Sequence, residues 1–446
     1  MKCNFQSGFA LPSVLLINLL VTTMLLSLLT IISFTNKSTN KLLEKKKLEL
    51  ACFSAVQLTL NDSTMLYADN TVINVNDIDV EIESKQLGFF RSLTASASGV
   101  NDSIRIRYVL GIKGSVNGYF SNAVVLSRLN LRATVAGNTQ INGDILGTSD
   151  KLVIGNIFGE PPTNKDFHKG IVKIDNNINQ QPISDSLFES ITNRYNNYAP
   201  LNYEEQNEIT AENLEYFDPE NVHQFAQDIK ITGTIKSKNN TPVILIVQGK
   251  VEFSEESYIK KHLELLSDSS VLIRRKSHLE NVIIYSNGPI IIEADSYFKN
   301  VQFFSTDRIF IQKSQFDYPS LICLNVDDTD SAKQDNAIVL DNTIVNGSVI
   351  MMTKTAGLSS NKTKIQIDKE SKVQGLVYSE NNLELAGEIT GTVFTYNFWH
   401  YKEPTEYINW LINVKINRNE LDEWYLLPIV FNDQGKIQIL KEEWIY

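Results

Sequence analysis

A long uncharged apolar run near the N-terminus constrains this chain more than any other feature. The run begins at Phe9, and no charged residue lies between Lys2 and Lys37. A helix rises about 1.5 Å per residue, so residues 9–34 would cross a bilayer core about 30 Å thick. The run is longer than the apolar core of a secretory signal, and no small-residue cleavage site follows it. The sequence therefore predicts a membrane-spanning helix.

The residues at the start of this run form a short motif. A leader of residues 1–8 with one basic residue, Lys2, ends in Gly8 and is followed by Phe9-Ala10-Leu11-Pro12. This pattern resembles the class III signal of type IV pilins and minor pseudopilins. The resemblance implies that a prepilin peptidase cuts between Gly8 and Phe9 on the cytoplasmic side. Methylation of the new terminal amine often accompanies this cut in the family.

The resemblance also implies a role for the residues after the cut. In the family the retained helix first anchors the chain in the inner membrane and then packs against other pilin-like subunits. Leu11, Pro12 and Ser13 would take part in that helix packing. Major subunits usually carry glutamate at the position of Ser13, where a buried ion pair with a neighbouring terminal amine sets the register. Its absence resembles K-type minor pseudopilins and PilX-like proteins, which lie at or near a filament tip.

The charges that flank the run favour the opposite orientation. Only Lys2 precedes the run, whereas five lysines follow it: Lys37, Lys41, Lys45, Lys46 and Lys47. The positive-inside rule would place the C-terminal body in the cytoplasm. The pilin-like interpretation places the body in the periplasm or at the cell surface. We favour the motif, because basic residues after the span also occur on pilin stalks, and a plain single-pass anchor stays open as the alternative.

The helix is predicted to continue beyond the membrane. One face collects apolar residues at helical spacing: Leu43, Leu50, Phe53, Val56 and Leu60. Residues 61–64 prefer turns and would end the helix. The sequence thus predicts one helix over residues 9–60, with an apolar first half and an amphipathic second half laid against a globular head. A span followed by a linker helix predicts the same pattern.

Composition and motifs argue against several function classes. The net charge is −11, and no basic stripe interleaved with aromatic residues occurs, so no nucleic acid partner is predicted. Cys3, Cys52 and Cys323 fit neither a disulfide framework nor a metal site. No nucleophile elbow, phosphate-binding loop or dinucleotide motif appears. The acidic run at 327–330 is typical of a solvated loop more than of a calcium site. We predict no enzyme activity, with no catalytic residue, no cofactor and no metal.

Two further segments precede the most regular part of the chain. Residues 61–156 predict an N-terminal β domain, because Asp79–Glu83 and Ser103–Leu110 alternate as half-buried strands do. After residue 122 the strands shorten and are separated by Gly, Asn and Asp, which is typical of a solenoid. Residues 157–235 are rich in Pro, Asn and Gln and predict a helical and loop insertion, with a short helix near 187–195.

Residues 236–397 contain a repeat of 19 residues. Val271–Ile273 recurs as Ile290–Ile292 and again as Ile309–Ile311. Nineteen residues are too few for a βαβ unit, which needs about 30, but they suit one coil of a right-handed parallel β-helix. Equivalent apolar residues would stack from coil to coil and form a continuous core. Asn281 would lie over Asn300 and form an amide ladder.

The C-terminal residues differ in composition from the repeat. All four tryptophans lie after residue 398, and the open end of a solenoid needs a cap. Residues 398–446 are therefore predicted to form an aromatic-rich cap, with a helix over 406–411 and strands at 429–431 and 436–440. The alternative is an exposed aromatic platform that binds a surface polysaccharide.

Together these observations predict a mainly β protein on a long membrane-spanning helix. The predicted function is that of a minor pilin-like subunit that primes or caps a type IV pilus or a type II secretion pseudopilus. One alternative is a membrane-tethered cytoplasmic scaffold similar to bactofilins, which the lysines support. The tryptophan-rich end opposes it, because a polymerising solenoid needs open ends. A surface adhesin or sugar-binding module is the other alternative.

Overall fold

The computed structural model describes residues 10–100, 102–114, 118–128, 132–149, 152–157, 159–161, 165–178, 208–210, 222–236, 243–326, 336–353, 363–431 and 436–444. The chain divides into two units. Unit 1 comprises Met1–Lys85, Ser92–Tyr108 and Glu442–Ile445, and unit 2 comprises Gln86–Arg91, Val109–Lys441 and Tyr446. The protein is mainly β, with one long N-terminal apolar helix and a large sheet of parallel strands that is consistent with a solenoid-like body.

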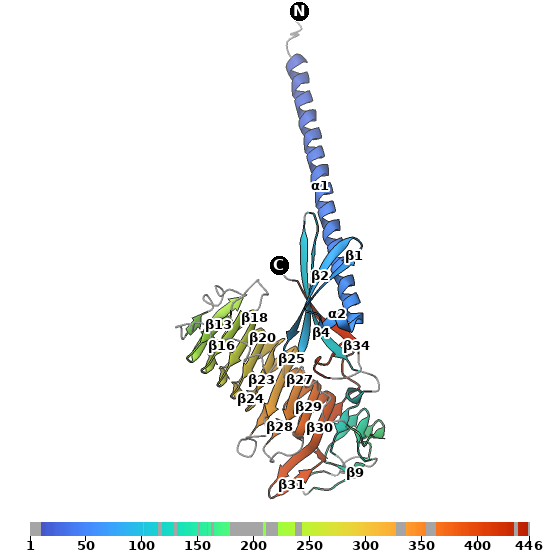
Figure 1. Ribbon diagram of the computed structural model, residues 1–446, viewed down its shortest axis with the longest axis vertical. Helices are drawn as coiled ribbons and strands as arrows, with labels where there is room; N and C mark the ends of the chain where they lie inside the picture. Colours follow the sequence, from blue (N-terminus) through green and yellow to red (C-terminus); the bar gives the residue numbers. More distant parts are fainter. Residues whose placement is uncertain are drawn as a thin grey trace, which may run out of the picture. The chain divides into compact units, whose positions relative to one another are not determined.

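Unit 1 combines a long helix with the larger part of an antiparallel sheet. Helix α1 runs from Ala10 to Asn61, and the short α2 (Ser63–Tyr67) follows, capped by the Asp62 carboxylate, which accepts the Thr64 N–H at 2.9 Å. The sheet order is β1-β2-β3-β4-β34, and Figure 1 labels β1, β2, β4 and β34. Its strands are β1 (Asn70–Val75), β2 (Ile78–Leu87), β3 (Phe90–Ser98), β4 (Ser103–Lys113) and β34 (Lys436–Trp444). Asn76 and Asp77 both have positive φ, which suits the tight turn between β1 and β2.

The second half of α1 is buried on one side. The buried residues are Leu48, Ala51, Cys52, Ala55, Val56 and Thr59. The apolar face predicted from helical spacing was wrong, because Leu43, Leu50 and Phe53 are exposed and only Val56 is buried. Small side chains on the buried side allow a close approach of the helix, and α1 contacts β1 and α2. The spacing argument chose the wrong face because it counted only large apolar residues and passed over the small buried ones, Ala51, Cys52 and Ala55.

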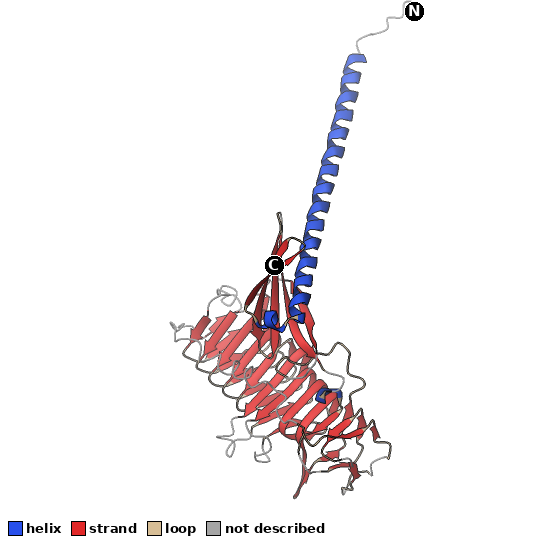
Figure 2. Cartoon of the chain, turned by 45° about the vertical axis from the view of Figure 1, so that its right-hand side comes forward, coloured by secondary structure: helices blue, strands red, loops and turns tan. Residues whose placement is uncertain are grey.

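Unit 2 is built mainly from short strands that pair in parallel with one another and form a stack (Figure 2); we call each layer of this stack a coil. The first strands along the chain are β5 (Val124–Leu126), β6 (Ala133–Ala136), β7 (Gln140–Asn142), β8 (Ile145–Gly147), β9 (Leu152–Ile154), β10 (His168–Lys169), β11 (Val172–Ile174), β12 (Glu208–Thr210), β13 (Val222–Phe225), β14 (Ile229–Thr232), β15 (Thr234–Lys236), β16 (Val243–Val247), β17 (Val251–Phe253), β18 (Tyr258–Ser267) and β19 (Val271–Ile273). The later strands are β20 (His278–Ser286), β21 (Ile290–Ile292), β22 (Tyr297–Lys299), β23 (Gln302–Ser305), β24 (Ile309–Gln312), β25 (Gln315–Val326), β26 (Ala337–Asp341), β27 (Ile344–Thr353), β28 (Lys364–Ile367), β29 (Lys372–Leu385), β30 (Glu388–Lys402), β31 (Thr405–Ile408), β32 (Trp410–Ile412) and β33 (Lys415–Asn417). A short 3₁₀ turn, η1, covers Tyr119–Ser121.

The 19-residue repeat sets the register of the middle coils. Val271 pairs with Ile290 and Ile290 with Ile309, and these inward side chains are fully buried. The Asn300 amide donates to the Asn281 side-chain oxygen at 2.7 Å, which confirms the predicted amide ladder. Both residues have a left-handed backbone, with φ of 61° and 52°, which asparagine tolerates better than most residues.

The order of the coils in space differs from their order in the chain. Strand β30 pairs with β5, β33 with β7, and β32 with β6. Strands β7 and β8 then pair with β10 and β11. The strands within 124–174 therefore lie next to the coil that ends at residue 417 and continue the stack from there. Strands β12 and β13 pair with β14 and β16 near the other end of the stack.

This order differs from the predicted division of the chain. A single β domain was expected over 61–156, but residues 70–113 form strands β1–β4 of the antiparallel sheet and residues 124–154 join the parallel stack. An insertion was expected over 157–235, but residues 222–236 form three strands of the stack. A cap was expected over 398–446, but residues 415–417 pair on both sides and lie inside the stack. In each case pairing with residues far away in sequence decided the outcome.

Two local predictions in the C-terminal region were wrong and one was confirmed. The helix predicted over 406–411 is replaced by β31 and β32, because Tyr407 pairs across a hairpin with His400 and Leu411 pairs with Val135. Residues 429–430 form a turn instead of a strand. The strand predicted at 436–440 is part of β34. The predicted leader 1–8, the helix near 187–195 and the acidic run 327–330 lie outside the described residues.

Candidate functional site

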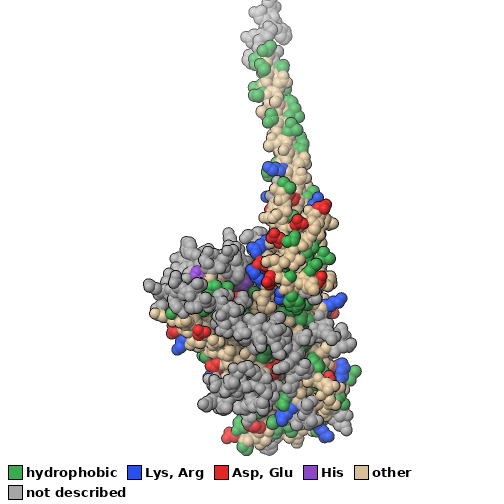
Figure 3. Space-filling model, in the orientation of Figure 1, with side chains coloured by type: hydrophobic (Ala, Val, Ile, Leu, Met, Phe, Trp, Pro, Cys, Tyr) green, Lys and Arg blue, Asp and Glu red, His purple; other side chains and the backbone are tan. Residues whose placement is uncertain are grey.

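The first candidate site is the apolar half of α1. Among the described residues, α1 is the one helix long and apolar enough to cross a membrane, and its apolar part is not buried. Figure 3 shows hydrophobic side chains along its upper part and charged side chains further down. The hydroxyls of Thr22, Thr30 and Thr35 donate to carbonyls four residues earlier at 2.7–2.8 Å. These bonds satisfy the polar groups within the helix itself, as a lipid environment requires.

The residues predicted for processing and helix packing lie at the start of this helix. Gly8 and Phe9, the predicted cleavage point, lie outside the described residues. Leu11, Pro12 and Ser13 lie in the first turn of α1 and are exposed, Leu11 by 75%. Proline is tolerated in a first turn, because the N–H groups there have no partner within the helix.

The second candidate site is a groove of about 710 Å³ on the outward face of unit 2. Its floor is made by Ile291, Phe310 and Val339, which lie on β21, β24 and β26 respectively. On each strand this residue points outward and lies between two residues that point inward. These residues pair in register from coil to coil, and Gln366 on β28 continues the row. Neighbouring residues in a strand face opposite sides, so the buried residues on either side of Ile291 turn it outward. Ile291 is 37% exposed.

Aromatic side chains form the wall of the groove. Trp399 and Tyr401 stand on the same side of β30, with ring centroids 6.1 Å apart and ring planes within 7° of parallel. Strand β30 continues into an antiparallel hairpin with β31, in which Tyr401 pairs with Glu406. Tyr401 is 48% exposed.

Charged groups line the groove beside these rings. The Lys364 ammonium lies 4.6 Å from the centre of the Trp399 ring and 2.6 Å from the Glu384 carboxylate. This double contact fixes the lysine side chain. The Arg308 guanidinium lies 3.9 Å from Asp307, at the outer limit of an ion pair, and its side chain is 54% exposed. Glu406 supplies a carboxylate at the hairpin.

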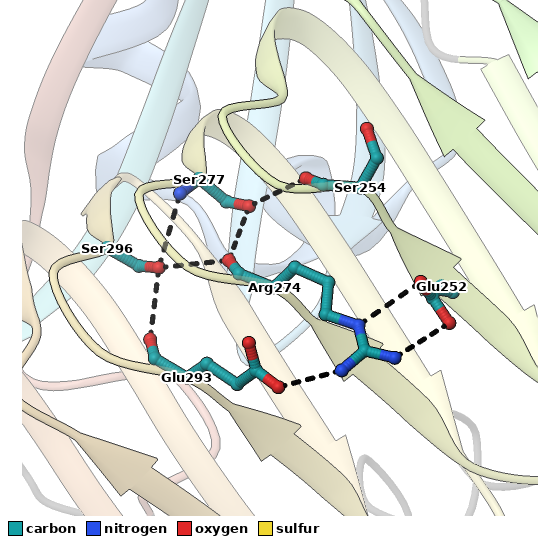
Figure 4. Close-up of polar contacts among 6 residues, drawn as sticks. All are labelled: Glu252, Ser254, Arg274, Ser277, Glu293 and Ser296. Atoms are coloured by element: carbon teal, nitrogen blue, oxygen red, sulfur yellow. Dashed lines mark hydrogen bonds and ion pairs between the residues drawn. The ribbon is translucent and has the colours of Figure 1, made fainter.

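A third cluster of charges, at a corner of the middle coils, already has its partners (Figure 4). The Arg274 guanidinium donates to Glu252 at 3.1 and 3.3 Å and to Glu293 at 2.9 Å, and thereby joins three successive coils. Hydrogen bonds to these two carboxylates raise the pKa of Arg274. In the same cluster the Ser277 hydroxyl donates to the Arg274 carbonyl at 2.7 Å. This cluster therefore acts as a structural clamp between coils.

The described residues contain no group of three or more His, Cys, Asp or Glu side chains that could hold a metal ion. Cys323 is buried, and this burial raises the pKa of its thiol. A raised thiol pKa disfavours the reactive thiolate.

Sequence reasoning found part of the groove and missed the rest. The aromatic residues of the wall were singled out, but Ile291, Phe310 and Val339 were not, because a run of three apolar residues suits a strand buried on both faces equally well. A signal was present: three coils in succession carry an apolar residue at an outward position. Only the fold shows that, among the described residues, no other element covers that row and that β30 reaches it.

Comparisons of this chain with protein families, with curated proteins and with solved structures found no match.

Proposed function

We propose that this chain is a minor pilin-like subunit of the inner membrane. Helix α1 anchors it after cleavage at Gly8, and the C-terminal body lies in the periplasm or at the cell surface. The subunit primes or caps a type IV pilus or a type II secretion pseudopilus. Unit 2, as a right-handed parallel β-helix, is the part it presents.

The observation that carries this proposal is the two-part character of α1. One unbroken helix of 52 residues has an exposed apolar first half and a second half buried on one side in the same unit as the antiparallel sheet. Exposed apolar surface of this extent needs lipid or protein around it. A helix that anchors a monomer and later packs in a filament meets both conditions in turn.

The residue at position 13 supports a role at the tip. Ser13 has no carboxylate that could pair with the terminal amine of a neighbouring subunit, and Ser13 is exposed near the start of the helix. A subunit that lacks this register-setting ion pair fits a position that occurs once in a filament more readily than one that repeats.

A cytoplasmic scaffold that polymerises through its coils is the second candidate. The five lysines after the apolar run support it through the positive-inside rule. One argument against it is weakened, because β33 of the predicted cap pairs with β30 on one side and with β7 on the other and so does not close an end. The two candidates therefore differ in processing and in orientation.

Intact-mass and N-terminal analysis of the full chain, extracted from membranes with and without a prepilin peptidase, separates them. We expect a chain that begins at Phe9, methylated or not, when the peptidase is active. A Gly8→Val variant, whose side chain obstructs the cleavage point, should keep Met1 and serves as the control. A wild-type chain that still begins at Met1 beside an active peptidase would overturn the proposal and favour the cytoplasmic scaffold.

A further inference from the structure

We propose that the groove on unit 2 binds a linear oligosaccharide of pyranose sugars. This site goes beyond the proposed filament role and depends only on residues of unit 2. Its components are the floor of Ile291, Phe310 and Val339 and the wall of Trp399 and Tyr401.

The wall suits one face of a sugar ring. A pyranose presents apolar C–H groups on its faces and hydroxyls at its edge, so its face packs on a flat aromatic surface while its edge keeps hydrogen-bond partners. The rings of Trp399 and Tyr401 stack nearly parallel on one strand, and Tyr401, which is 48% exposed, offers the more exposed ring of the two. From this ring the groove continues along the row of Ile291, Phe310 and Val339, which favours a chain of sugars over a single sugar.

The floor and the rim suit the remaining surface of the same ligand. The apolar side chains of the floor lie beside Gln366 and Arg308, which can bond hydroxyl groups. A purely apolar ligand would remove these polar groups from water without a partner, at a cost in binding. The volume of about 710 Å³ lies within the range of about 300–1,000 Å³ that is usual for ligand sites.

The pairing of the strands argues against an extended peptide as the ligand. Peptides that join a sheet need an unpaired strand edge. The floor strands are paired on both sides: β21 with β19 and β24, β24 with β26, and β26 with β28. A ligand on this floor therefore contacts side chains and not main-chain groups.

The wall is formed before a ligand arrives. Lys364 is held between Glu384 and the Trp399 ring, so little side-chain freedom remains to be lost at this position on binding.

Saturation-transfer NMR and tryptophan fluorescence on the full chain in detergent test the proposal. The probes are cellohexaose, chitohexaose and hexagalacturonate, which share a linear pyranose backbone and differ in substituents and charge. We expect at least one probe to bind, with affinity reduced about tenfold or more by Tyr401→Ala. Trp424→Ala is the matched control, because Trp424 is an aromatic residue of unit 2 that is 56% exposed and does not line the groove.

Two results would overturn this site. One is failure of the wild-type chain to bind any of the three oligosaccharides. The other is binding that Tyr401→Ala leaves unchanged, or that Trp424→Ala weakens equally. Circular dichroism of both variants must match the wild type, and Tyr401→Phe, which keeps the ring, should retain most of the affinity. None of these outcomes depends on processing at Gly8.

Discussion

Several coils of unit 2 change direction two residues after a buried inward residue, at a position that we call a corner. This corner is built in two different ways in two regions of unit 2. In the middle coils the corner holds Asn281 and Asn300, each two residues after a fully buried inward residue. In the later coils the equivalent position holds three glycines that pair in register: Gly347, Gly375 and Gly391. We call these the asparagine corner and the glycine corner.

The two corners use different physical means. The asparagine corner has a left-handed backbone and a side-chain hydrogen bond from coil to coil. The glycine corner has φ between 141° and 157° and brings the backbones together, so that a Cβ on Gly375 would lie 2.0 Å from the Gly347 carbonyl oxygen. Side-chain ladders therefore hold one region, and close backbone approach holds the other. The first arrangement should tolerate substitution better than the second.

Replacement of a corner glycine should have the largest effect. In Gly375→Ala the new methyl group meets the Gly347 carbonyl and, at 2.7 Å, the Tyr425 ring, in a backbone conformation that side chains rarely adopt. We expect a loss of stability of about 4 kcal/mol or more, measured as a shift of the unfolding midpoint in urea.

Gly147→Ala is the control for this change, because a Cβ there would have its nearest contact at 3.9 Å. It should change stability by less than about 0.5 kcal/mol. Equal midpoints for the two variants would show that the glycine corner is not constrained by close approach.

Replacement at the asparagine corner should have a smaller effect that separates backbone from side chain. Asn300→Ala loses the side-chain hydrogen bond to Asn281 and places alanine at φ 52°. We therefore expect it to lower the free energy of unfolding by about 2 kcal/mol. Asn300→Gly loses the same bond but adopts this φ freely, and should lose about 1 kcal/mol. Urea unfolding of both variants measures the difference. Equal losses of stability would show that the left-handed backbone at this corner does not strain alanine.

Acid should weaken the middle coils selectively, and this is the smallest effect. Hydrogen bonds from Lys276 and Lys313 lower the pKa values of Glu256 and Asp295 in the folded protein. A carboxyl group whose pKa is lower in the folded protein stabilises the fold at pH values above its pKa in the unfolded chain, near pH 4. This stabilisation is lost as the pH falls through the pKa of the folded protein. Hydrogen exchange should therefore show protection falling below pH 4 around residues 254–296.

The glycine corner is the internal reference for this experiment, because its three residues carry no titratable group. Its protection, corrected for the intrinsic exchange rate, should change less over the same range. The double variant Lys276→Gln and Lys313→Gln should remove the extra acid sensitivity of the middle coils. If the variant behaves as the wild type, these ion pairs do not contribute.

The regular part of the fold could be predicted from the sequence, because its signals repeat at a fixed spacing. Val271, Ile290 and Ile309 stack as the period of 19 residues predicts, and the amide ladder follows the same period. The long helix and the alternating strands β2 and β4 were likewise local signals. The glycine corner was not recognised as the counterpart of the asparagine corner, because longer coils interrupt the period after Gln312.

The sequence by itself therefore determined the long apolar helix, the mainly β character and the stacking of the middle coils. Only the tertiary structure decided that residues 124–174 extend the stack after residue 417, and that β30 carries Trp399 to the row of Ile291, Phe310 and Val339. Parallel pairing between strands about 270 residues apart leaves no periodic trace in the sequence. The entropy of closing so long a connection grows only slowly with its length, so the distance in sequence does little to prevent it.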